Sequence, residues 1–441
     1  MPPGPWRPWA VAERGWVVKL ARQQEFVVTD LVREDGSAAW RSLCQLFISA
    51  YVIMAFAVVK ALPSKFNYPL ILLGFACLLV APRDPLRRMP VNGFLVLLLV
   101  WTTASYSWSY YPPLTKTVLR SEIPFSVAAV GLASVLPLAL FVRAMLRGMY
   151  VGLGITALAI ATRGSARAHF NDGVAYLAGW HGMFEHKNTM TAFLVMVAAA
   201  VLSFEHRPRV RRWSQVLIVV LVLGAKSSTG LSALLALYCC RFWLVRYTRE
   251  GAIRRASFVM LSILGFGVAI AGFVAFLPFI VNLYGKDLTF TGRTQIWSAA
   301  LWAIGKRLTM GYGREGVWFR TGIPPTYEID QRIGFVAGHA HNAYLELLLE
   351  VGLVGLVLYV GLLRSAFRAA WRRMTVTPDI AGWGIMCLTA QFVASLSESP
   401  VFGIWFVIPG WIYVFNRRRI AVAAEQPVEG ERAGVGAGPR Q

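Results

Sequence analysis

The chain has 441 residues, of which 56% are hydrophobic and 15% charged, and its formal net charge is +22. Its mean hydropathy of +0.54 excludes a water-soluble domain of this length and indicates a polytopic membrane protein. The positive charge does not indicate nucleic-acid binding, because Arg and Lys gather in short loops between apolar runs, where they orient a protein in the bilayer.

Taken in chain order, the sequence predicts one all-α integral membrane domain with about twelve transmembrane helices, found as apolar windows of roughly 20 residues. Residues 1–40 are polar and basic and are predicted to be a cytoplasmic segment without a signal peptide. Residues 41–281 are expected to hold helices 1–9, and residues 342–416 helices 10–12. Residues 282–341 form one long outer loop, and residues 417–441 a disordered cytoplasmic tail.

The distribution of basic residues predicts the orientation of these helices. The spans are expected to start near Arg41, Tyr68, Val91, Pro124, Met145, Asn188, Trp213, Thr229, Ser257, Asn342, Ile380 and Val401. Alternate loops are rich in arginine, at residues 83–88, 143–147, 207–212, 241–255, 364–373 and 417–419, whereas the intervening loops are sparse. Both termini are therefore predicted to be cytoplasmic, and the long loop and five of the six histidines to face outward.

Two outer segments before the long loop carry basic and hydroxyl residues suited to an anion. In the segment 163–188, Arg163 and Lys187 lie at the outer ends of two spans, and Lys187 directly starts an apolar helix. Snorkelling to lipid head groups is the alternative for these cations and is the interpretation of Arg167. The turn AKSSTG contains Lys226 and Ser227 and resembles a phosphate-binding turn, although it lacks the strand and Gly-rich loop of a Walker motif. The alternative there is a plain polar turn in a hairpin of two short helices.

Within the long loop, FTGRTQIWSAALWAIGKRL predicts an amphipathic helix that lies on the membrane surface or roofs a cavity. Its predicted apolar face consists of Ile296, Trp297, Ala300, Leu301, Ile304 and Leu308. Arg293 lies in the first turn, where a cation opposes the helix macrodipole unless an anion sits between them. We therefore interpret Arg293 as a ligand-binding arginine whose planar fork suits a diphosphate.

The stretch GHAHNAYLELLLEVGLVG places ionisable groups at the predicted start of an apolar helix. His341 stands at the helix N-terminus, which suits an anion, and an imidazole there can accept a proton from a hydroxyl. His339 and Glu346 are the alternatives for that base. Another interpretation is that His341 and Asn342 only cap the helix, while Glu346 and Glu350 pair with arginines. Zinc bound by the two histidines is disfavoured, because no third ligand lies in local spacing.

These segments together predict an outward-facing cavity, lined by cations for an anion and by histidine for proton transfer. Glu398, at the outer end of a later span, is predicted to hold one of the cations in place. The predicted substrate-binding residues are Arg163, His186, Lys187, Asn188, Lys226, Ser227, Asn342 and Glu398. The span interiors are nearly free of charge, which favours an enzyme over a transporter with ionisable groups at mid-membrane. A structural assembly protein would leave the outer cations unexplained.

The motifs GMFEHKNTM, KSSTG, TGRTQIW, GYG and AHNAYLELLLEVGLVG occur in an order that resembles the O-antigen ligase/polymerase superfamily, and within it exopolysaccharide-production polymerases. This resemblance extends from about Trp40 to about Phe415. It implies glycosyl transfer on the outer face of the bacterial cytoplasmic membrane. The donor would be a glycan on a polyprenyl diphosphate, and the acceptor a glycan or a lipid. No cofactor, metal or nucleic acid is implied, and polysaccharide-assembly proteins are expected as partners.

Carried over residue by residue, the resemblance implies that Arg293 holds the diphosphate and that His341 activates the acceptor hydroxyl. Lys187 and Lys226 match basic positions near the donor. The superfamily includes lipid A-core ligases, polymerases and protein glycosyltransferases, and the FEHKN form favours an exopolysaccharide or O-antigen polymerase. The alternative function is a lipid-linked glycan flippase or another polytopic transporter.

Overall fold

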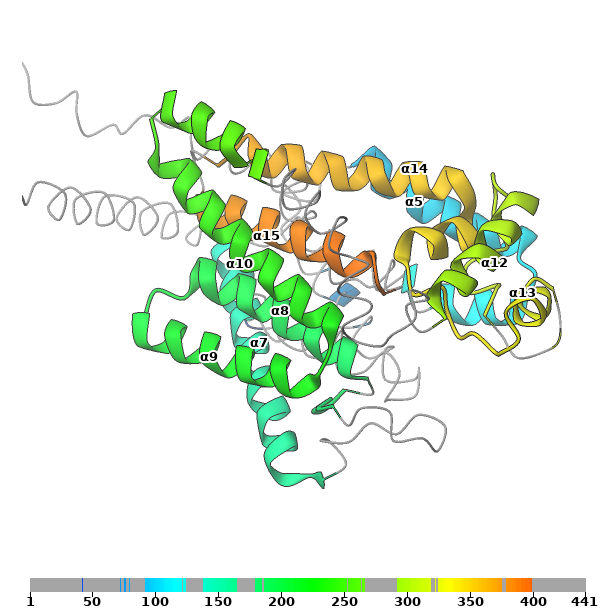
Figure 1. The fold of residues 1–441 in the computed structure, drawn as a ribbon, viewed down its shortest axis with the longest axis horizontal. Coiled ribbons are helices and arrows are strands. Elements are labelled where there is room, and N and C mark those ends of the chain that lie inside the picture. The colour runs from blue at the N-terminus through cyan, green and yellow to red at the C-terminus, as the bar shows by residue number, and fades with distance from the viewer. Residues whose placement is uncertain are drawn as a thin grey trace, which may run out of the picture.

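A computed structural model describes the chain from residue 92 to residue 398 with gaps. The described residues are 92–120, 122–123, 138–164, 179–184, 186–251, 253–262, 264–265, 292–318, 322, 324–374 and 378–398, with single positions 42, 72, 75, 76 and 79. The predicted N-terminal segment, the C-terminal tail and the start of the long loop lie outside them. Helices are present in these residues and strands are not, as predicted for an all-α protein (Figure 1).

The helices follow the apolar windows of the sequence. They are α5 (Gly93–Ala104), the 3₁₀ turn η2 (Ser105–Trp108), α7 (Leu138–Thr162), α8 (Lys187–Phe204), α9 (Pro208–Ala225), α10 (Ser228–Arg249), α12 (Arg293–Lys306), α13 (Thr326–Ile333), α14 (Ala343–Trp371) and α15 (Pro378–Ser395). Four described helices are long and apolar enough to cross a membrane: Val142–Thr162 within α7, α8, α10 and α14. These helices fit an integral membrane protein. The spans predicted near Pro124 and Val401 lie outside the described residues, and those near Arg41 and Tyr68 are described only at the single positions given above.

Helix α8 is the centre of the bundle. It packs against α7, α9, α10 and α15. Nearly every side chain from Met190 to Val201 is buried, and the run Ala198–Ala200 is fully so. Small side chains permit such close approach, which is how helices associate in membranes where lipid is as apolar as the core. As a result, the first residues of α8 are held at the middle of one end of the bundle.

Helix α14 is broken at Gly352, although the sequence suggested one uninterrupted span. The backbone there has φ 67° and ψ −169°, a conformation open essentially to glycine alone. The loop after α12 pairs with the chain at the break: Tyr312 N donates to Leu349 O at 2.7 Å and Leu353 N to Leu308 O at 2.7 Å. A Cβ at Gly352 would lie 2.2 Å from the carbonyl oxygen of Thr309. The GYG motif is therefore part of a backbone junction.

A buried ion network holds the same junction. The Arg314 guanidinium donates two hydrogen bonds from one nitrogen to Glu350, at 2.7 and 2.8 Å. Its other nitrogens donate to Glu122 at 2.7 and 3.1 Å. Glu350 also accepts a hydrogen bond of 3.1 Å from the backbone N–H of Glu315. The expectation that glutamates of this helix pair with arginines is thus confirmed for Glu350.

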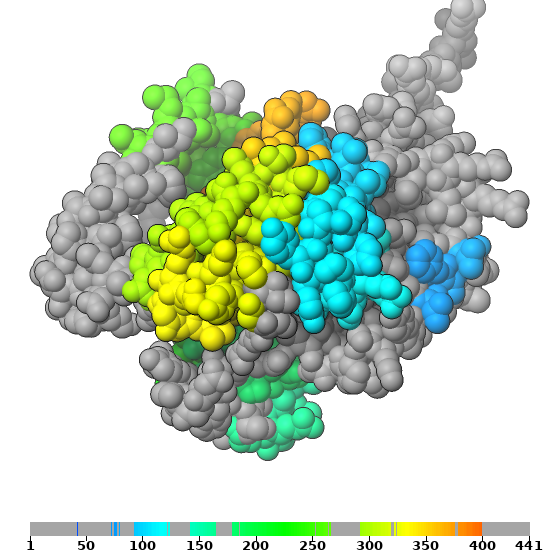
Figure 2. Space-filling view, turned by 90° about the vertical axis from the view of Figure 1, so that its right-hand side faces the viewer, coloured from blue at the N-terminus to red at the C-terminus, as the bar shows by residue number. Residues whose placement is uncertain are grey.

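Helices α12 and α13 form a cap over the end of the bundle at which α14 begins, and in Figure 2 they lie beside the residues of α5 and the segment that follows it. The cap has a small core of its own, shared by α12, α13, the GYG loop and Leu349 of α14. The opposite face of the same turns of α14, with Leu347 and Val351, belongs to the core of the bundle. The first turns of α14 are therefore common to both cores.

The buried face of α12 was predicted only in part. Ile296, Ala300 and Ile304 are buried as expected, but Leu301 and Leu308 are 55% and 47% exposed. The cap core uses Ala299 and Ala303 instead. Alanines allow α13 and α14 to approach α12 closely, so the buried face is rotated away from the bulkier leucine.

Candidate active site

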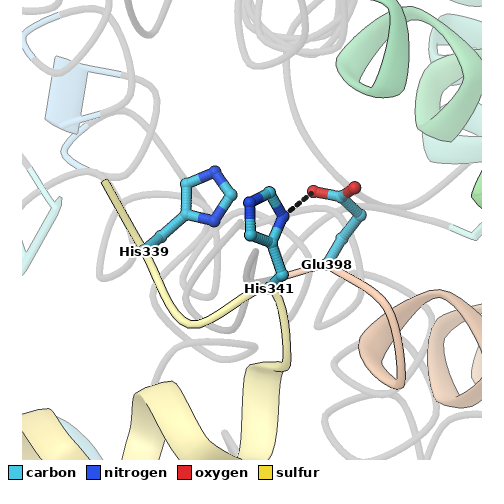
Figure 3. Close-up of side chains that lie close together, drawn as sticks. All are labelled: His339, His341 and Glu398. Carbon is cyan, nitrogen blue, oxygen red and sulfur yellow. Dashed lines mark ion pairs between the residues drawn. The ribbon is translucent and has the colours of Figure 1, made fainter. Parts of the chain in front are cut away.

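Glu398 lies where four segments meet: the start of α8, the start of α12, the loop before α14 and the end of α15. Its oxygen Oε1 accepts a 2.5 Å hydrogen bond from Asn188 Nδ2 and lies 3.7 Å from a guanidinium nitrogen of Arg293. Its oxygen Oε2 lies 4.0 Å from Nδ1 of His341. Figure 3 shows Glu398 facing the edge of the His341 ring, with His339 on the other side of that ring. Two of the residues that converge here, Asn188 and Glu398, lie 210 positions apart in sequence.

Arg293 is the first residue of α12, as predicted. It follows Gly292, whose φ of 83° turns the chain into the helix without a side-chain cap. One guanidinium nitrogen donates to the carbonyl oxygen of Ser397 at 2.8 Å. The anion that the helix macrodipole requires near this cation is the carboxylate of Glu398. At 3.7 Å this ion pair is longer than a hydrogen bond, so the arginine fork is not saturated by it.

The loop that carries His341 is fixed by contacts to its backbone. Trp297 Nε1 donates to the carbonyl oxygen of Ala340 at 2.9 Å, and Ala340 N donates to Glu346 Oε2 at 2.8 Å. The other oxygen of Glu346 accepts a short hydrogen bond from Trp318 Nε1. Both carboxylate oxygens of Glu346 are therefore engaged in holding the loop. Its predicted role as an alternative base is not favoured by this geometry.

Helix capping explains two of the predicted site residues. The side chain of Asn342 accepts from Tyr344 N and Leu345 N, at 3.0 and 3.1 Å, and so caps α14. In the same way, Nδ1 of His186 accepts from the backbone N–H of Asn188 at 3.1 Å and caps α8. His341 takes no part in capping; it has a left-handed backbone with φ 50°. The capping interpretation therefore holds for Asn342 and does not hold for His341.

The two ionisable groups at the centre differ in proton affinity. Burial and three basic neighbours lower the pKa of His341 to about 3, and these neighbours are His339, Arg293 and His186. Burial raises the pKa of Glu398 to about 7, although Arg293 and Lys187 oppose this shift. A near-neutral pKa is usual for an imidazole. The structure instead places it at the glutamate.

A chain of hydrogen bonds ties Glu398 to the KSSTG turn. Asn188, which donates to Glu398, accepts from Ser227 Oγ at 2.8 Å. Ser227 also caps α10 by accepting from Gly230 N at 3.1 Å. In addition, the hydroxyls of Thr229 and Ser397 are 2.8 Å apart. The turn therefore connects the start of α10 to the cluster. It is a polar turn between two helices, and it is also hydrogen-bonded to the site.

The structure does not bring every predicted residue to the cluster. Lys187 faces Glu398 closely enough to lower its pKa. By contrast, Lys226 is exposed in a left-handed turn, and Arg163 is exposed just beyond α7. Neither side chain has a hydrogen bond or ion pair to the cluster within the described residues. The residues brought together are His186, Lys187, Asn188, Ser227, Arg293, His339, His341 and Glu398.

The donor types at the centre include those of a zinc site. His339, His341 and Glu398 each offer a ligand atom, and these atoms all lie within 4.8 Å of one another. The third ligand missing from the local sequence is thus supplied by a distant residue. However, Arg293 pairs with the same carboxylate, and Lys187 also faces it. A metal ion would be repelled by both of these cations, so the arrangement suits an anion better than a metal.

Comparison with known proteins agrees with the resemblance noted in the sequence. A family model described as O-antigen ligase matches residues 213–360. The chain is also 31% identical over 129 residues to the exopolysaccharide production protein ExoQ of Rhizobium meliloti (strain 1021). Residues 213–360 are thus similar to the O-antigen ligase family, and part of the chain is similar to a protein of exopolysaccharide production. The match to ExoQ covers 28% of this chain and 29% of that relative.

The region shared with the O-antigen ligase family contains part of the cluster. Arg293, His339 and His341 lie inside residues 213–360, whereas Asn188 and Glu398 lie outside. From the sequence, Glu398 was predicted to hold a cation and to be among the substrate-binding residues, and Arg314 was not singled out. The signal for Glu398 was an acidic residue beside an apolar span, which many membrane proteins also show.

Proposed function

We propose that this protein is a metal-independent membrane glycosyltransferase that polymerises or ligates glycans carried on a polyprenyl diphosphate. The acceptor is the hydroxyl of a glycan or of a lipid-linked saccharide. The observation that carries this proposal is the cluster itself: one guanidinium and one ammonium for an anion stand beside an imidazole and a carboxylate for a proton. All of them lie at the shared end of long apolar helices.

The donor diphosphate is assigned to Arg293 and Lys187. Lys187 is the first residue of α8, so free backbone N–H groups and the positive end of the helix dipole face the same place. During transfer, negative charge grows on the diphosphate as it leaves. Fixed cations that meet this charge lower the barrier, and such groups are worth about 10²–10³ in rate.

The acceptor hydroxyl is assigned to His341. The oxygen of this hydroxyl forms the new bond to the anomeric carbon of the donor sugar, while the bond from that carbon to the diphosphate oxygen breaks. The hydroxyl proton leaves toward the imidazole, which is neutral because the pKa of His341 is about 3. His339, whose ring centroid lies 3.8 Å from that of His341, limits where the acceptor can approach.

The orientation predicted from the sequence accompanies this proposal: about twelve spans, cytoplasmic termini and the long loop 282–341 outside the cytoplasmic membrane. The helices support it, because α8, α10 and α14 all begin at the cluster. At their other ends lie arginines, among them Arg207, Arg246 and Arg368. The cluster would then face the exterior, with residues 1–40 and 417–441 in the cytoplasm and the spans in 41–281 and 342–416.

Polymerisation is the form of transfer that we favour. The relative is named as an exopolysaccharide production protein, and the FEHKN motif points the same way. The partners would be polysaccharide-assembly proteins, together with the lipid bilayer in which the prenyl chain is held.

A direct test is glycan extension by the purified protein in detergent, with a polyprenyl-diphosphate oligosaccharide as the substrate and a gel to resolve longer products. We expect a ladder with wild type and a loss of about 10²–10⁴-fold with His341→Ala, the range for removing a general base. Glu328→Gln, in the exposed pair with Lys306, is the matched control and should behave as wild type. Absence of any glycan transfer by wild type would reject the proposed function.

A further inference from the structure

We propose that Glu398 is the final acceptor of the hydroxyl proton and receives it through His341, so that the two side chains act as one proton relay. This inference rests on the proposed function and assigns a further role to a residue that the sequence suggested as a partner of a cation and a substrate-binding residue. Glu398 acts through the histidine, and is in that sense a positioning and proton-accepting residue.

The two oxygens of Glu398 have different surroundings, and this asymmetry orients the carboxylate. Oε1 is engaged by Asn188 at 2.5 Å and lies toward Arg293. Oε2 is thereby turned to His341, with 4.0 Å between it and Nδ1. Nδ1 of His341 is buried and has no hydrogen-bond partner within the described residues. A closure of about 1 Å would bring the two atoms into hydrogen-bond range.

With this orientation the proton can pass across the ring. Nε2 of His341 takes the proton of the acceptor hydroxyl as the new carbon–oxygen bond forms. At the same time Nδ1–H gives its proton to Oε2 of Glu398, so the imidazole ends neutral. The electron pair of the broken carbon–oxygen bond leaves with the diphosphate. One proton moves from acceptor to carboxylate, and no other reactant is needed.

The electrostatics favour the carboxylate as the place where the proton rests. The charged and titratable groups that face it are Arg293 from α12, Lys187 and His186 from the start of α8, and His339 and His341 from the loop before α14. A protonated His341 would be a buried cation beside these basic groups, and its pKa of about 3 reflects the burial first and the basic neighbours second. Glu398 becomes neutral when it takes up the proton, and burial favours this neutral form, which raises its pKa to about 7 although Arg293 and Lys187 oppose the shift.

Donor binding should strengthen this relay. Arg293 and Lys187 lower the pKa of Glu398 in the free protein. A diphosphate bound to these cations cancels their effect and adds negative charge nearby, so the pKa of Glu398 rises when the donor is present. The carboxylate therefore becomes a better proton acceptor in the complex that is about to react.

The experiment is the pH dependence of glycan transfer for wild type, Glu398→Gln and Glu398→Asp, with Glu328→Gln as control. For wild type, kcat/KM should rise with pH through about 7, as Glu398 loses its proton. The corresponding limb of kcat should lie at higher pH, because kcat reports the donor complex. In Glu398→Gln, kcat/KM should fall by about 10²-fold and should no longer rise with pH near 7. In Glu398→Asp, transfer should be slower, but the rise with pH should remain.

The glutamine variant separates a proton acceptor from a structural residue. A limb near pH 7 that survives in Glu398→Gln would overturn the inference, because another group then titrates. A wild-type rate in that variant would overturn it as well. If the glutamine variant does not fold, judged by gel filtration in detergent, Glu398→Asp decides the matter: loss of its limb rejects the relay. In each case normal transfer by wild type leaves the proposed function standing.

Discussion

Two arginines that follow glycines in the cap have opposite surroundings. Arg314 is 9% exposed and is bound by Glu350 and Glu122 through bonds of 2.7 to 3.1 Å. Arg293 is 24% exposed, and its one carboxylate partner is 3.7 Å away. The first side chain is saturated by short bonds, whereas the second retains donors for a ligand. Burial of a charge thus marks the structural arginine, and incomplete pairing marks the candidate binding arginine.

The largest effect is expected at the saturated arginine. Arg314→Met leaves Glu350 and Glu122 in a buried site without their cation, which costs about 3–5 kcal/mol when one partner of a buried pair is removed. We expect little folded protein after extraction, measured as the midpoint of thermal aggregation in detergent. Arg332→Met, at an exposed cation over Trp302, is the control and should melt as wild type. An unchanged midpoint for Arg314→Met would show that the network does not hold the junction.

At the unsaturated arginine the effect should fall on activity instead. Arg293→Lys keeps the charge but not the two-pronged fork, so we expect transfer to fall by about 10²-fold with an unchanged melting midpoint. The loss should be seen in the extension assay at saturating acceptor. A variant that loses stability and activity together would place Arg293 with Arg314 among structural residues, and the contrast between them would disappear.

A smaller effect is expected at Lys226, which the resemblance placed near the donor. Its side chain is exposed and makes no described bond to the cluster, unlike Lys187. Lys226→Ala should therefore change the transfer rate by less than about threefold, whereas Lys187→Ala should lower it by at least about tenfold. Equal losses in the two variants would show that the turn moves toward the donor when it binds.

The smallest effect is expected from a chelator. The ligand atoms of His339, His341 and Glu398 are close together, but two cations face the same carboxylate. EDTA should leave the transfer rate unchanged, and added Zn²⁺ should not raise it. A rate that falls with EDTA and returns with Zn²⁺ would contradict the metal-independent mechanism.

Patterns local in sequence predicted much of this molecule. The apolar windows predicted α8, α10 and α14, and the macrodipole argument predicted that Arg293 has an anion beside it, which is Glu398. The importance of Glu398 and Arg314 was underestimated, because it depends on contacts that include partners 210 and 192 residues away, respectively. The pKa order of His341 and Glu398 could not be predicted either, since burial and distant cations determine it.

The rotation of α12 and the break in α14 escaped prediction for a different reason. Both depend on which surfaces pack together, and the sequence alone does not show whether an alanine in a helix faces a core or solvent. The glycines of GYG and of EVGLVG are evident in the sequence, but their close backbone contact is evident only once both segments are placed in three dimensions.

The break at Gly352 divides α14 into two mechanical parts. The segment before it is a wall shared between the cap and the bundle, with Leu349 on one side and Leu347 on the other. His341 directly precedes that segment, so a movement of the cap relative to the helix bundle would change the position of its side chain. Under the proposed function, a prenyl chain bound among the long helices and a sugar bound at the cap would therefore both affect the position of the same imidazole.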